Sequence, residues 1–290
     1  MKNLEYIATN KVKLLDCLFE IMPSKSRTTV KSYLRNGQVS IGDMRCTQFD
    51  HEVNPGDRVV VSFEKVKEGL KHPLIRIVYE DEYLVVVNKN SGLLSIATDK
   101  EMNKTAYNII RDYLRREDEN AKVFVVHRLD RETSGLMVFA KDEQTKHDMQ
   151  RNWEDVVTER KYVAVCEGEM EKKDGVIETY LTESKALKVY ATTKEQGRVA
   201  RTHLKVLKTS YRRNLSLVQL QLSTGRKNQI RAHLEYIGFP IIGDKKYGAK
   251  YLSPIGRVAL HALSLCFIHP VTGEHLKFQT SMPVQFLKLF

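Results

Sequence analysis

The chain has 290 residues, enough for one medium-sized domain and one small accessory domain. It carries 47 Lys and Arg against 36 Asp and Glu, and this net charge of +11 favours a polyanionic partner such as nucleic acid, with a merely soluble basic protein as the alternative. The four cysteines are too scattered for a zinc site, and no segment is apolar enough for a secretion signal or a membrane span, so we expect a cytoplasmic protein with no metal and no membrane association.

Residues 12–63 form a predicted compact unit that begins helical and ends in short strands. Its first apolar residues recur at helical spacing (Leu14, Leu15, Leu18 and Phe19). A second helix is predicted over SRTTVKSYLRNG, with Ser26 as the N-cap and Gly37 at the end. The segment QVSIGD, a turn at residues 54–57 and the strand RVVVSF complete the unit.

The second predicted helix is basic. Arg27, Lys31 and Arg35 follow at i, i+4 and i+8, so they lie near one face, and Lys25 precedes them with no acid in between. Such a run is often only a solvated face. The missing acids favour a face that contacts RNA phosphates.

The order of these pieces resembles the small S4 RNA-binding domain: apolar helix, basic helix, short strand with Gly, and a closing strand after Pro-Gly-Asp. The charged stretch EKVKEGLKHPL at residues 64–74 suits a linker. We therefore expect a small α/β S4-like domain with an N-terminal extension over residues 1–68, and a second domain over residues 69–290.

The second domain alternates strand signals with fewer helices. Strands are predicted at IRIVYE, YLVVVNK, VFVV, LMVFA, RKYVAVCEG, VIETYL, THLKVL and LSLVQLQLS, the last with leucines on one buried face. Helices are predicted over residues 103–116, 142–153 after an Asp142 cap, and 228–237. Because the connections are mostly short, we expect an α+β fold with a mixed, largely antiparallel sheet flanked by helices.

The sharpest chemical signal is HRLDRETSGLMVFAK at residues 127–141. The predicted strand VFVV runs into a polar turn in which Asp130 stands between Arg128 and Arg131. Nearby positive charge favours the carboxylate form, which can act as a nucleophile or stabilise developing positive charge. A salt-bridged surface turn is the alternative interpretation of the same charges.

Two further segments carry polar residues in an apolar setting. In LSTGRKNQIRAHLEYIGFPIIGDKKYG, Arg226 stands at a helix entrance, and Arg231 lies where it can pair with Glu235 or with a carboxylate from elsewhere. In RKYVAV, Tyr162 begins an apolar strand, where a tyrosine is by default a core aromatic.

Together these segments resemble the RluA family of pseudouridine synthases over residues 75–290. The motifs Arg-Leu-Asp-Arg-x-Thr-Ser-Gly, Arg-Lys-Tyr, Thr-Gly-Arg-x-x-Gln-Ile-Arg and Gly-Asp-x-x-Tyr-Gly occur in the family's order. The resemblance implies the pseudouridine synthase fold and makes Asp130 the essential aspartate, Tyr162 the active-site tyrosine and Arg231 the basic partner of the aspartate. Arg128 would fill the gap left by an extruded base, and Arg226 would contact substrate or support the structure.

The implied reaction suits these residue types. Forming pseudouridine breaks the bond from ribose to N1 of uracil and joins C5 to the same sugar carbon, so positive charge develops on the sugar and a carboxylate can stabilise or capture it. The nucleotide must first leave its stack, and Tyr162 offers a face and a hydroxyl to the freed base. No dinucleotide motif, P-loop or metal cluster is present, and we expect no cofactor.

The sequence departs from the family at two positions, with Asn228 in place of His and Asn90 in place of Pro. Two other functions compete: an RNA-binding assembly factor without activity, and a hydrolase that would need a second carboxylate, for which Glu132 is the nearby candidate. We expect a monomer that acts on RNA and not on DNA. Large-subunit ribosomal RNA is the expected substrate, because similar enzymes with an S4-like domain act there, and transfer RNA is the alternative.

Overall fold

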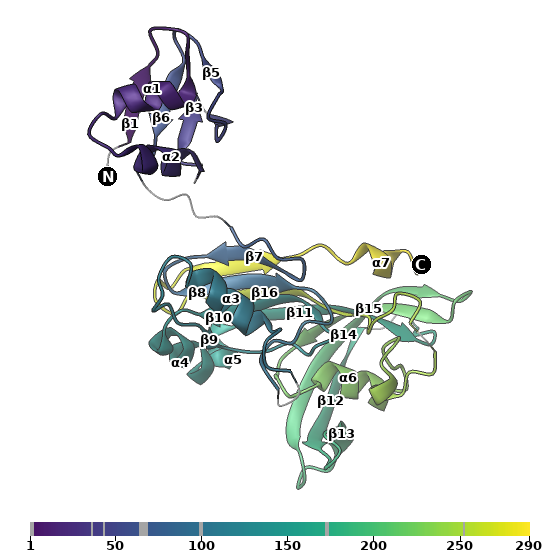
Figure 1. Cartoon of the computed structure of the whole chain (residues 1–290). Helices are drawn as coiled ribbons and strands as arrows, with labels where there is room; N and C mark the ends of the chain where they lie inside the picture. The colour runs from purple at the N-terminus through teal and green to yellow at the C-terminus, as the bar shows by residue number, and fades with distance from the viewer. Residues whose placement is uncertain are drawn as a thin grey trace. The chain divides into compact units, whose positions relative to one another are not determined.

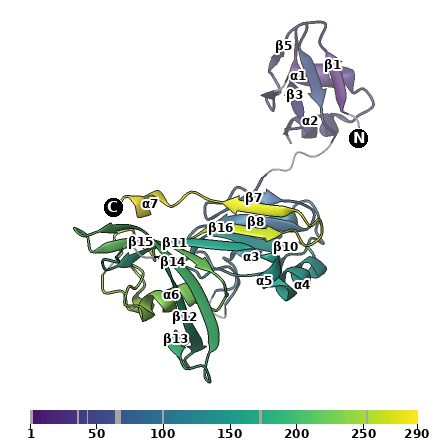
Figure 2. The same ribbon diagram turned by 180° about the vertical axis from the view of Figure 1, so that it is seen from behind.

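The computed structural model describes residues 3–35, 37–42, 44–63, 69–98, 101–171, 174–251 and 253–290. The chain divides into two compact units, Met1–Gly69 and Leu70–Phe290, which Figure 1 and Figure 2 show from opposite sides. Each unit has its own apolar core and is described by itself. Residues 64–68 of the expected linker lie outside the described residues.

The first unit packs two helices against a small sheet. Both expected helices are present, as α1 (Leu14–Ile21) and α2 (Arg27–Arg35), and the Ser26 hydroxyl accepts a hydrogen bond from the Thr29 N–H at 3.2 Å. One core joins the helices to the strands, through residues that include Leu18, Val30 and Val59. The four-stranded sheet has the order β1 (Leu4–Ile7), β6 (Arg58–Val61), β3 (Val39–Ile41) and β4 (Met44–Arg45), while β2 (Val12–Lys13) pairs with β5 (Glu52–Val53).

The second unit is built on one large sheet. Nine strands follow one another in the order β13-β12-β14-β15-β11-β16-β10-β8-β7, β17 pairs with β16, and β9 pairs with β10. Among the described strands, only the contact of β10 with β16 is parallel, which confirms the predicted α+β fold with a mixed, largely antiparallel sheet. The strand bounds are β7 (Ile75–Glu80), β8 (Leu84–Lys89), β9 (Phe124–Val125), β10 (Ser134–Ala140), β11 (Glu159–Glu167), β12 (Asp174–Glu183), β13 (Val189–Thr192), β14 (Arg198–Ser210), β15 (Leu215–Leu222), β16 (Leu260–Ile268) and β17 (His275–Gln279).

Helices α3 (Ala106–Leu114) and α4 (Glu143–Arg151) pack on opposite faces of the same strands. On β8, Val85 and Val87 join the core of α3, whereas Leu84 and Val86 join the core of α4. Successive side chains of a strand point to opposite faces, so an apolar run rather than an alternating one builds this double-sided layer.

The remaining helices are α5 (Trp153–Val156), α6 (Gln229–Tyr236), the 3₁₀ turn η1 (Lys245–Tyr247) and α7 (Val284–Leu287). The predicted helix over residues 142–153 is present as α4, but it ends at Arg151 because the backbone leaves the helical region at Asn152, and α5 begins anew. The predicted cap is present: the Asp142 side chain accepts a hydrogen bond from the Thr145 N–H at 2.8 Å. No helix in the described part of the chain has the length and apolar character that crossing a membrane requires.

Strand β15 corrects a second expectation. Its first four residues, Leu215 to Val218, are all buried, so the strand does not have one buried and one exposed face there. The core that encloses it contains Ile230 of α6 and Phe286 of α7, and Figures 1 and 2 show these helices on opposite sides of the strands. Helices α6 and α7, from distant parts of the chain, therefore help to bury both faces of this part of β15, where the sequence pattern predicted one buried face.

A glycine permits the parallel contact between β10 and β16. Gly135 has φ +115°, and a Cβ built there would lie 2.1 Å from the carbonyl oxygen of Ala262. Any larger residue would push β16 away from β10. Gly135 therefore allows β16 to pair with the first residues of β10, directly after the turn that contains Asp130.

Candidate active site

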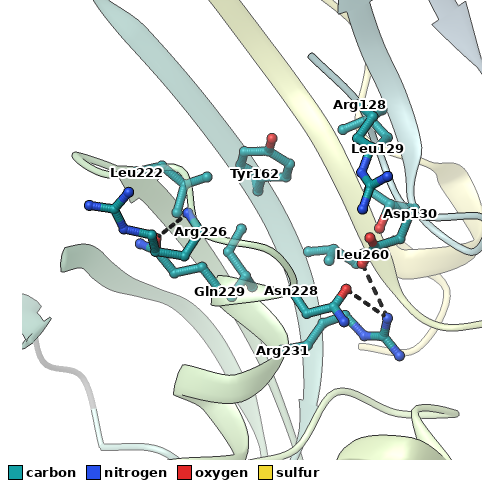
Figure 3. A pocket seen from close by; sticks show the side chains of 12 residues that line it. Arg128, Leu129, Asp130, Tyr162, Leu222, Arg226, Asn228, Gln229, Arg231 and Leu260 are labelled. Atoms are coloured by element: carbon teal, nitrogen blue, oxygen red, sulfur yellow. Dashed lines mark hydrogen bonds and ion pairs between the residues drawn. The ribbon is translucent and has the colours of Figure 1, made fainter. Parts of the chain in front are cut away.

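Asp130 lies in the loop between β9 and β10, at one side of the pocket drawn in Figure 3. Its Oδ2 atom accepts a hydrogen bond from Arg231 Nη1 of α6 at 3.1 Å. Glu235, the local alternative for Arg231, instead pairs with Lys188 at 2.7 Å. Of the two partners that the sequence left open for Arg231, the structure selects the distant carboxylate.

Arg231 also holds a second carboxylate, which was not predicted from the sequence. Its Nε and Nη2 atoms donate to both oxygens of Asp244 at 2.6 and 2.8 Å, and Asp244 is buried. Burial opposes the charge of Arg231, but the ion pairs with Asp244 and Asp130 outweigh it and raise the pKa of the guanidinium above its ordinary value. Because Asp244 fixes the guanidinium in two places, Arg231 presents a positioned N–H to Asp130.

Asn228, a departure from the family pattern, lies directly against Asp130. With its amide oriented to satisfy both neighbours, Asn228 Nδ2 donates to Asp130 Oδ2 at 2.6 Å and Oδ1 at 3.0 Å, and its oxygen accepts from the Tyr247 hydroxyl at 3.0 Å. Asn228 stands before α6 with φ 50°, a left-handed conformation that asparagine tolerates better than most residues. No role for this residue followed from the sequence, although its position in the Arg-rich motif was the available signal.

Tyr162 forms one wall of the same pocket. Figure 3 shows its ring between Leu222 and Asp130, and Leu222, Ile230 and Leu260 add apolar surface. Burial raises the pKa of the Tyr162 hydroxyl; Arg160 opposes this shift and the charge of Asp130 adds to it. The hydroxyl therefore keeps its proton at neutral pH. The face of such a ring can stack against a planar base, with a carboxylate within the same pocket.

The backbone of the Asp130 loop is held by the last residue of β8 and by the segment that follows it. Lys89 is fully buried, and its Nζ donates to the carbonyl oxygens of Asp130 and Arg131, both at 3.3 Å. Ser95 accepts a hydrogen bond from the Leu129 N–H at 3.1 Å and donates to the Leu129 carbonyl at 2.6 Å. These contacts fix the loop without using the Asp130 side chain, which remains free to meet Arg231 and Asn228.

Lys89 should make the stability of the folded state rise with pH between about 7 and 10. Burial lowers the pKa of Lys89 to about 7, although the charges of Asp130 and Glu132 oppose that shift, whereas the ordinary value is 10.5. Within this window the unfolded chain binds the proton and the folded chain does not, so the free energy of unfolding increases by up to about 1.4 kcal/mol per pH unit. Below the window both states are charged and the effect disappears.

Urea unfolding at several pH values measures this dependence. The Lys89→Met variant should lack the increase, and Lys122→Met, which removes an exposed lysine, should retain it. Equal pH slopes in the wild type and in Lys89→Met would contradict the assignment.

The second family departure, Asn90, makes two contacts to the segment before β7. Its backbone N–H donates to the Leu74 carbonyl at 2.8 Å, and its side-chain amide donates to the Pro73 carbonyl at 3.0 Å. A proline has no N–H and could make neither bond. Asn90 therefore ties the start of the second unit to the end of β8.

The other predicted site residues lie in two places, the pocket beside Asp130 and the first unit. Arg128 and Arg226 line the pocket, and Arg226 Nε donates to the Val199 carbonyl at 3.0 Å. Neither Arg128 nor Arg131 forms an ion pair with Asp130 among the described residues; Arg131 pairs with Glu101, and Asp130 pairs with Arg231. The four remaining cations belong to α2 and the turn before it in the first unit (Lys25, Arg27, Lys31 and Arg35).

Acidic groups are few at this pocket. Asp130 is the only acid among the described residues that line it and the adjoining cavity. Glu132 instead lies beside Ser91, whose hydroxyl donates to its backbone carbonyl at 2.7 Å. No cluster of three His, Cys, Asp or Glu side chains suited to a metal ion occurs within the described ranges.

Comparison with known proteins places this chain in one family. A family model described as RNA pseudouridylate synthase matches residues 83–236. The chain is 33% identical over 270 residues to the RNA pseudouridine synthase YlyB of Bacillus subtilis (91% of this chain, 88% of that one) and 30% identical over 294 residues to ribosomal large subunit pseudouridine synthase D of Haemophilus influenzae (96% and 90%). It is also similar to the solved structure of human RNA Pseudouridylate Synthase Domain Containing 4, with a TM-score of 0.60 and 26% identity over 73% of this chain and 92% of that one.

Proposed function

The chain belongs to the RNA pseudouridylate synthase family, and from this membership we propose that it converts specific uridines of structured RNA, in large-subunit ribosomal RNA, to pseudouridine. The name of the Haemophilus influenzae relative supports ribosomal RNA as the substrate class. The observation that carries the proposal is the Asp130 carboxylate, held by Arg231 and Asn228 beside the ring of Tyr162.

Asp130 is the group that acts on the sugar. The bond between N1 and the sugar carbon breaks and a bond from C5 to that carbon forms, while N1 gains a hydrogen and C5 loses one. The carboxylate stabilises or captures the positive charge that develops on the sugar during the first step. Arg231 and Asn228 both donate to it, so it is fixed in place before the substrate arrives.

In this proposal Tyr162 contacts the extruded base, and Arg128 fills the gap that the base leaves in the RNA. The target nucleotide has to leave its stack to reach a carboxylate inside a pocket. Tyr162 offers a ring face for the uracil, and its protonated hydroxyl lies in the pocket where C5 must be turned toward the sugar. Arg128 is exposed at the rim, two residues from Asp130, where it can occupy the vacated position in the RNA.

The test uses unmodified transcripts of large-subunit ribosomal RNA and of transfer RNA, each labelled with tritium at C5 of uridine. Because C5 loses its hydrogen, turnover releases tritium into water. We expect release from the ribosomal RNA and pseudouridine at a small number of mapped positions. Release from transfer RNA alone would move the substrate to that class, and release from neither RNA would overturn the proposed function.

The first unit acts in this proposal as an S4-like RNA-binding domain. Arg27, Lys31 and Arg35 are exposed on α2, and none forms an ion pair with an acid in the described part of the chain. Other cations of the same unit do have acidic partners, as in the pair of Lys11 with Glu52 at 3.0 Å. Cations without acidic partners are available to RNA phosphates.

Replacing Arg27, Lys31 and Arg35 with Ala should weaken binding to long structured RNA. The slope of log affinity against log salt should fall by roughly 0.7 to 0.9 for each RNA phosphate that the protein no longer neutralises, because fewer counterions are released. Saturating RNA should restore most of the turnover rate, since these side chains supply affinity and touch no reacting atom. Filter binding across a salt series and turnover at high RNA concentration provide the two measurements.

The matched control replaces Lys11 and Arg58, which already lie near acids of the same unit. We expect little change in its salt slope. An unchanged slope in the triple variant would mean that the α2 cations face only water, and a turnover rate that stays low at saturation would show that the unit contributes to catalysis itself.

A further inference from the structure

A second cavity of about 480 Å³ adjoins the Asp130 pocket and shares Arg128, Tyr162 and Asn228 with it. Its far wall is formed by Trp153 of α5 and Arg160 of β11. The proposed reaction places the uracil against Tyr162 and uses neither of these two residues. The cavity is large enough to hold a group that is attached to the target nucleotide.

Arg160 is the unusual member of this wall. It is only 9% exposed, yet its side chain forms no hydrogen bond or ion pair with any residue that the structure describes. Its guanidinium lies over the Trp153 ring, 5.6 Å from the ring centre. Burial lowers the pKa of Arg160 below its ordinary value, and electrostatic interactions with Tyr162 and Glu154 oppose that shift.

The backbone at Gly225 lies close to this guanidinium. A Cβ built on Gly225 would lie 2.7 Å from Arg160 Nη1, so the turn before α6 has a glycine where the cation approaches it. Trp153 supports the guanidinium on one face through a cation–π contact. The cation is therefore held by packing and without an acidic partner.

A largely buried guanidinium without an acidic partner costs free energy, which an anion bound in the cavity that Arg160 lines would offset. The cavity gathers further positive charge, since Arg128 and Arg226 also line it, whereas Lys227 of the same lining is paired with Glu183. Its one carboxylate among the described residues, Asp130, is already bound by Arg231 and Asn228. The charge balance of the cavity thus favours an anionic ligand.

We propose that this cavity is a subsite for a phosphodiester group of the RNA next to the target uridine, and that Arg160 binds it through its guanidinium. The inference rests on the proposed function, because it assumes an RNA substrate in the adjoining pocket. The planar guanidinium presents parallel N–H donors that match two phosphate oxygens. Such a contact would anchor the backbone beside Asp130 while the base turns.

The test compares Arg160→Met with the wild type, using an unmodified transcript of large-subunit ribosomal RNA as the probe. We expect the melting temperature of the free variant to stay the same or rise, because a buried charge without a partner is removed. Its RNA affinity at low salt should fall, and the slope of log affinity against log salt should decrease by about 0.7 to 0.9, the change expected when one phosphate is no longer neutralised. Arg160→Lys should keep most of that slope, since it keeps the charge.

Gly225→Ala gives an independent route to the same site. The added methyl group should displace the Arg160 guanidinium and reduce the slope, and it should have no further effect when combined with Arg160→Met. The matched control is Arg76→Met, which removes an exposed arginine on the edge strand β7 and should leave the slope unchanged.

Three results would overturn the subsite. They are an unchanged salt slope in both Arg160→Met and Gly225→Ala, additive effects of the two changes, and stabilisation of the wild type by inorganic phosphate with no change in the RNA slope of the variants. The last would identify a site for free phosphate. Tritium release by the wild type on the same transcript separates the two proposals, because release with an unchanged slope removes only the subsite.

Discussion

Asp130→Asn should reduce tritium release from uridine-labelled RNA by at least about a thousandfold while the protein stays folded and binds RNA. The amide has nearly the same shape as the carboxylate but no charge with which to stabilise or capture the sugar carbon. Loss of a single preorganised group that faces developing charge commonly costs 10²- to 10³-fold, roughly 3 to 4 kcal/mol, and a group that meets the reacting carbon should exceed it.

The structure explains why folding should survive this change. Arg231 keeps its two hydrogen bonds to Asp244 when the charge of Asp130 is lost, so no buried cation is left without a partner. The loop is held through its backbone by Lys89, which does not depend on the Asp130 side chain.

Single-turnover tritium release and thermal unfolding measure the two effects of Asp130→Asn. Asp118→Asn, at an exposed position, is the matched control and should behave as the wild type. Activity of Asp130→Asn within a factor of ten of the wild type would remove Asp130 from the mechanism.

Arg231→Met should reduce both activity and stability, in contrast to Asp130→Asn. The Asp244 side chain is 1% exposed, and Arg231 supplies both hydrogen bonds to its carboxylate oxygens from within α6. Removing one partner of a buried ion pair typically costs about 3 to 5 kcal/mol, because the remaining charge is left in an apolar setting. Activity should fall at least about a hundredfold, since Asp130 loses a donor that fixes it.

A double variant separates the two effects. Arg231→Met with Asp244→Asn removes the stranded charge, so it should recover much of the lost free energy of unfolding and none of the activity. Arg231→Lys should be less stable and less active than the wild type, because one ammonium cannot bond both Asp244 oxygens and Asp130 in the same geometry. Urea unfolding and tritium release on the same preparations give the comparison. Recovery of activity in the double variant would show that Arg231 acts only as a structural partner of Asp244.

The sequence pattern predicted those features that depend on interactions between residues close together in the chain. The Asp142 and Ser26 caps were predicted because a short polar side chain at a helix start satisfies a nearby N–H, and both bonds are present. The short connections between strands predicted the largely antiparallel sheet. The motif order identified the family, and with it Asp130, Tyr162 and Arg231 as candidates, whose individual roles stay predictions.

Features that depend on contacts between distant parts of the chain did not follow from the sequence pattern. Strand β16 was not predicted, although it lies between β11 and β10 near the middle of the sheet. Its burial alternates only in part, because neighbours on both faces cover it. The two-sided burial of β15 was missed for the same reason: cover from α6 and α7 is contributed by segments far along the chain.

The sequence by itself determined the family, the fold class and the segments that hold the candidate site residues, since these depend on residue type, spacing and order. Only the tertiary structure decided which side chains meet: Arg231 with Asp130 and Asp244 rather than with Glu235, Asn228 with Asp130, and Arg160 with no acid among the described residues. Asp130 and Arg231 are 101 residues apart along the chain. Ion pairing acts over a few ångströms in space, so the pairing of the sheet strands, and not sequence neighbourhood, selects the partner of each charge.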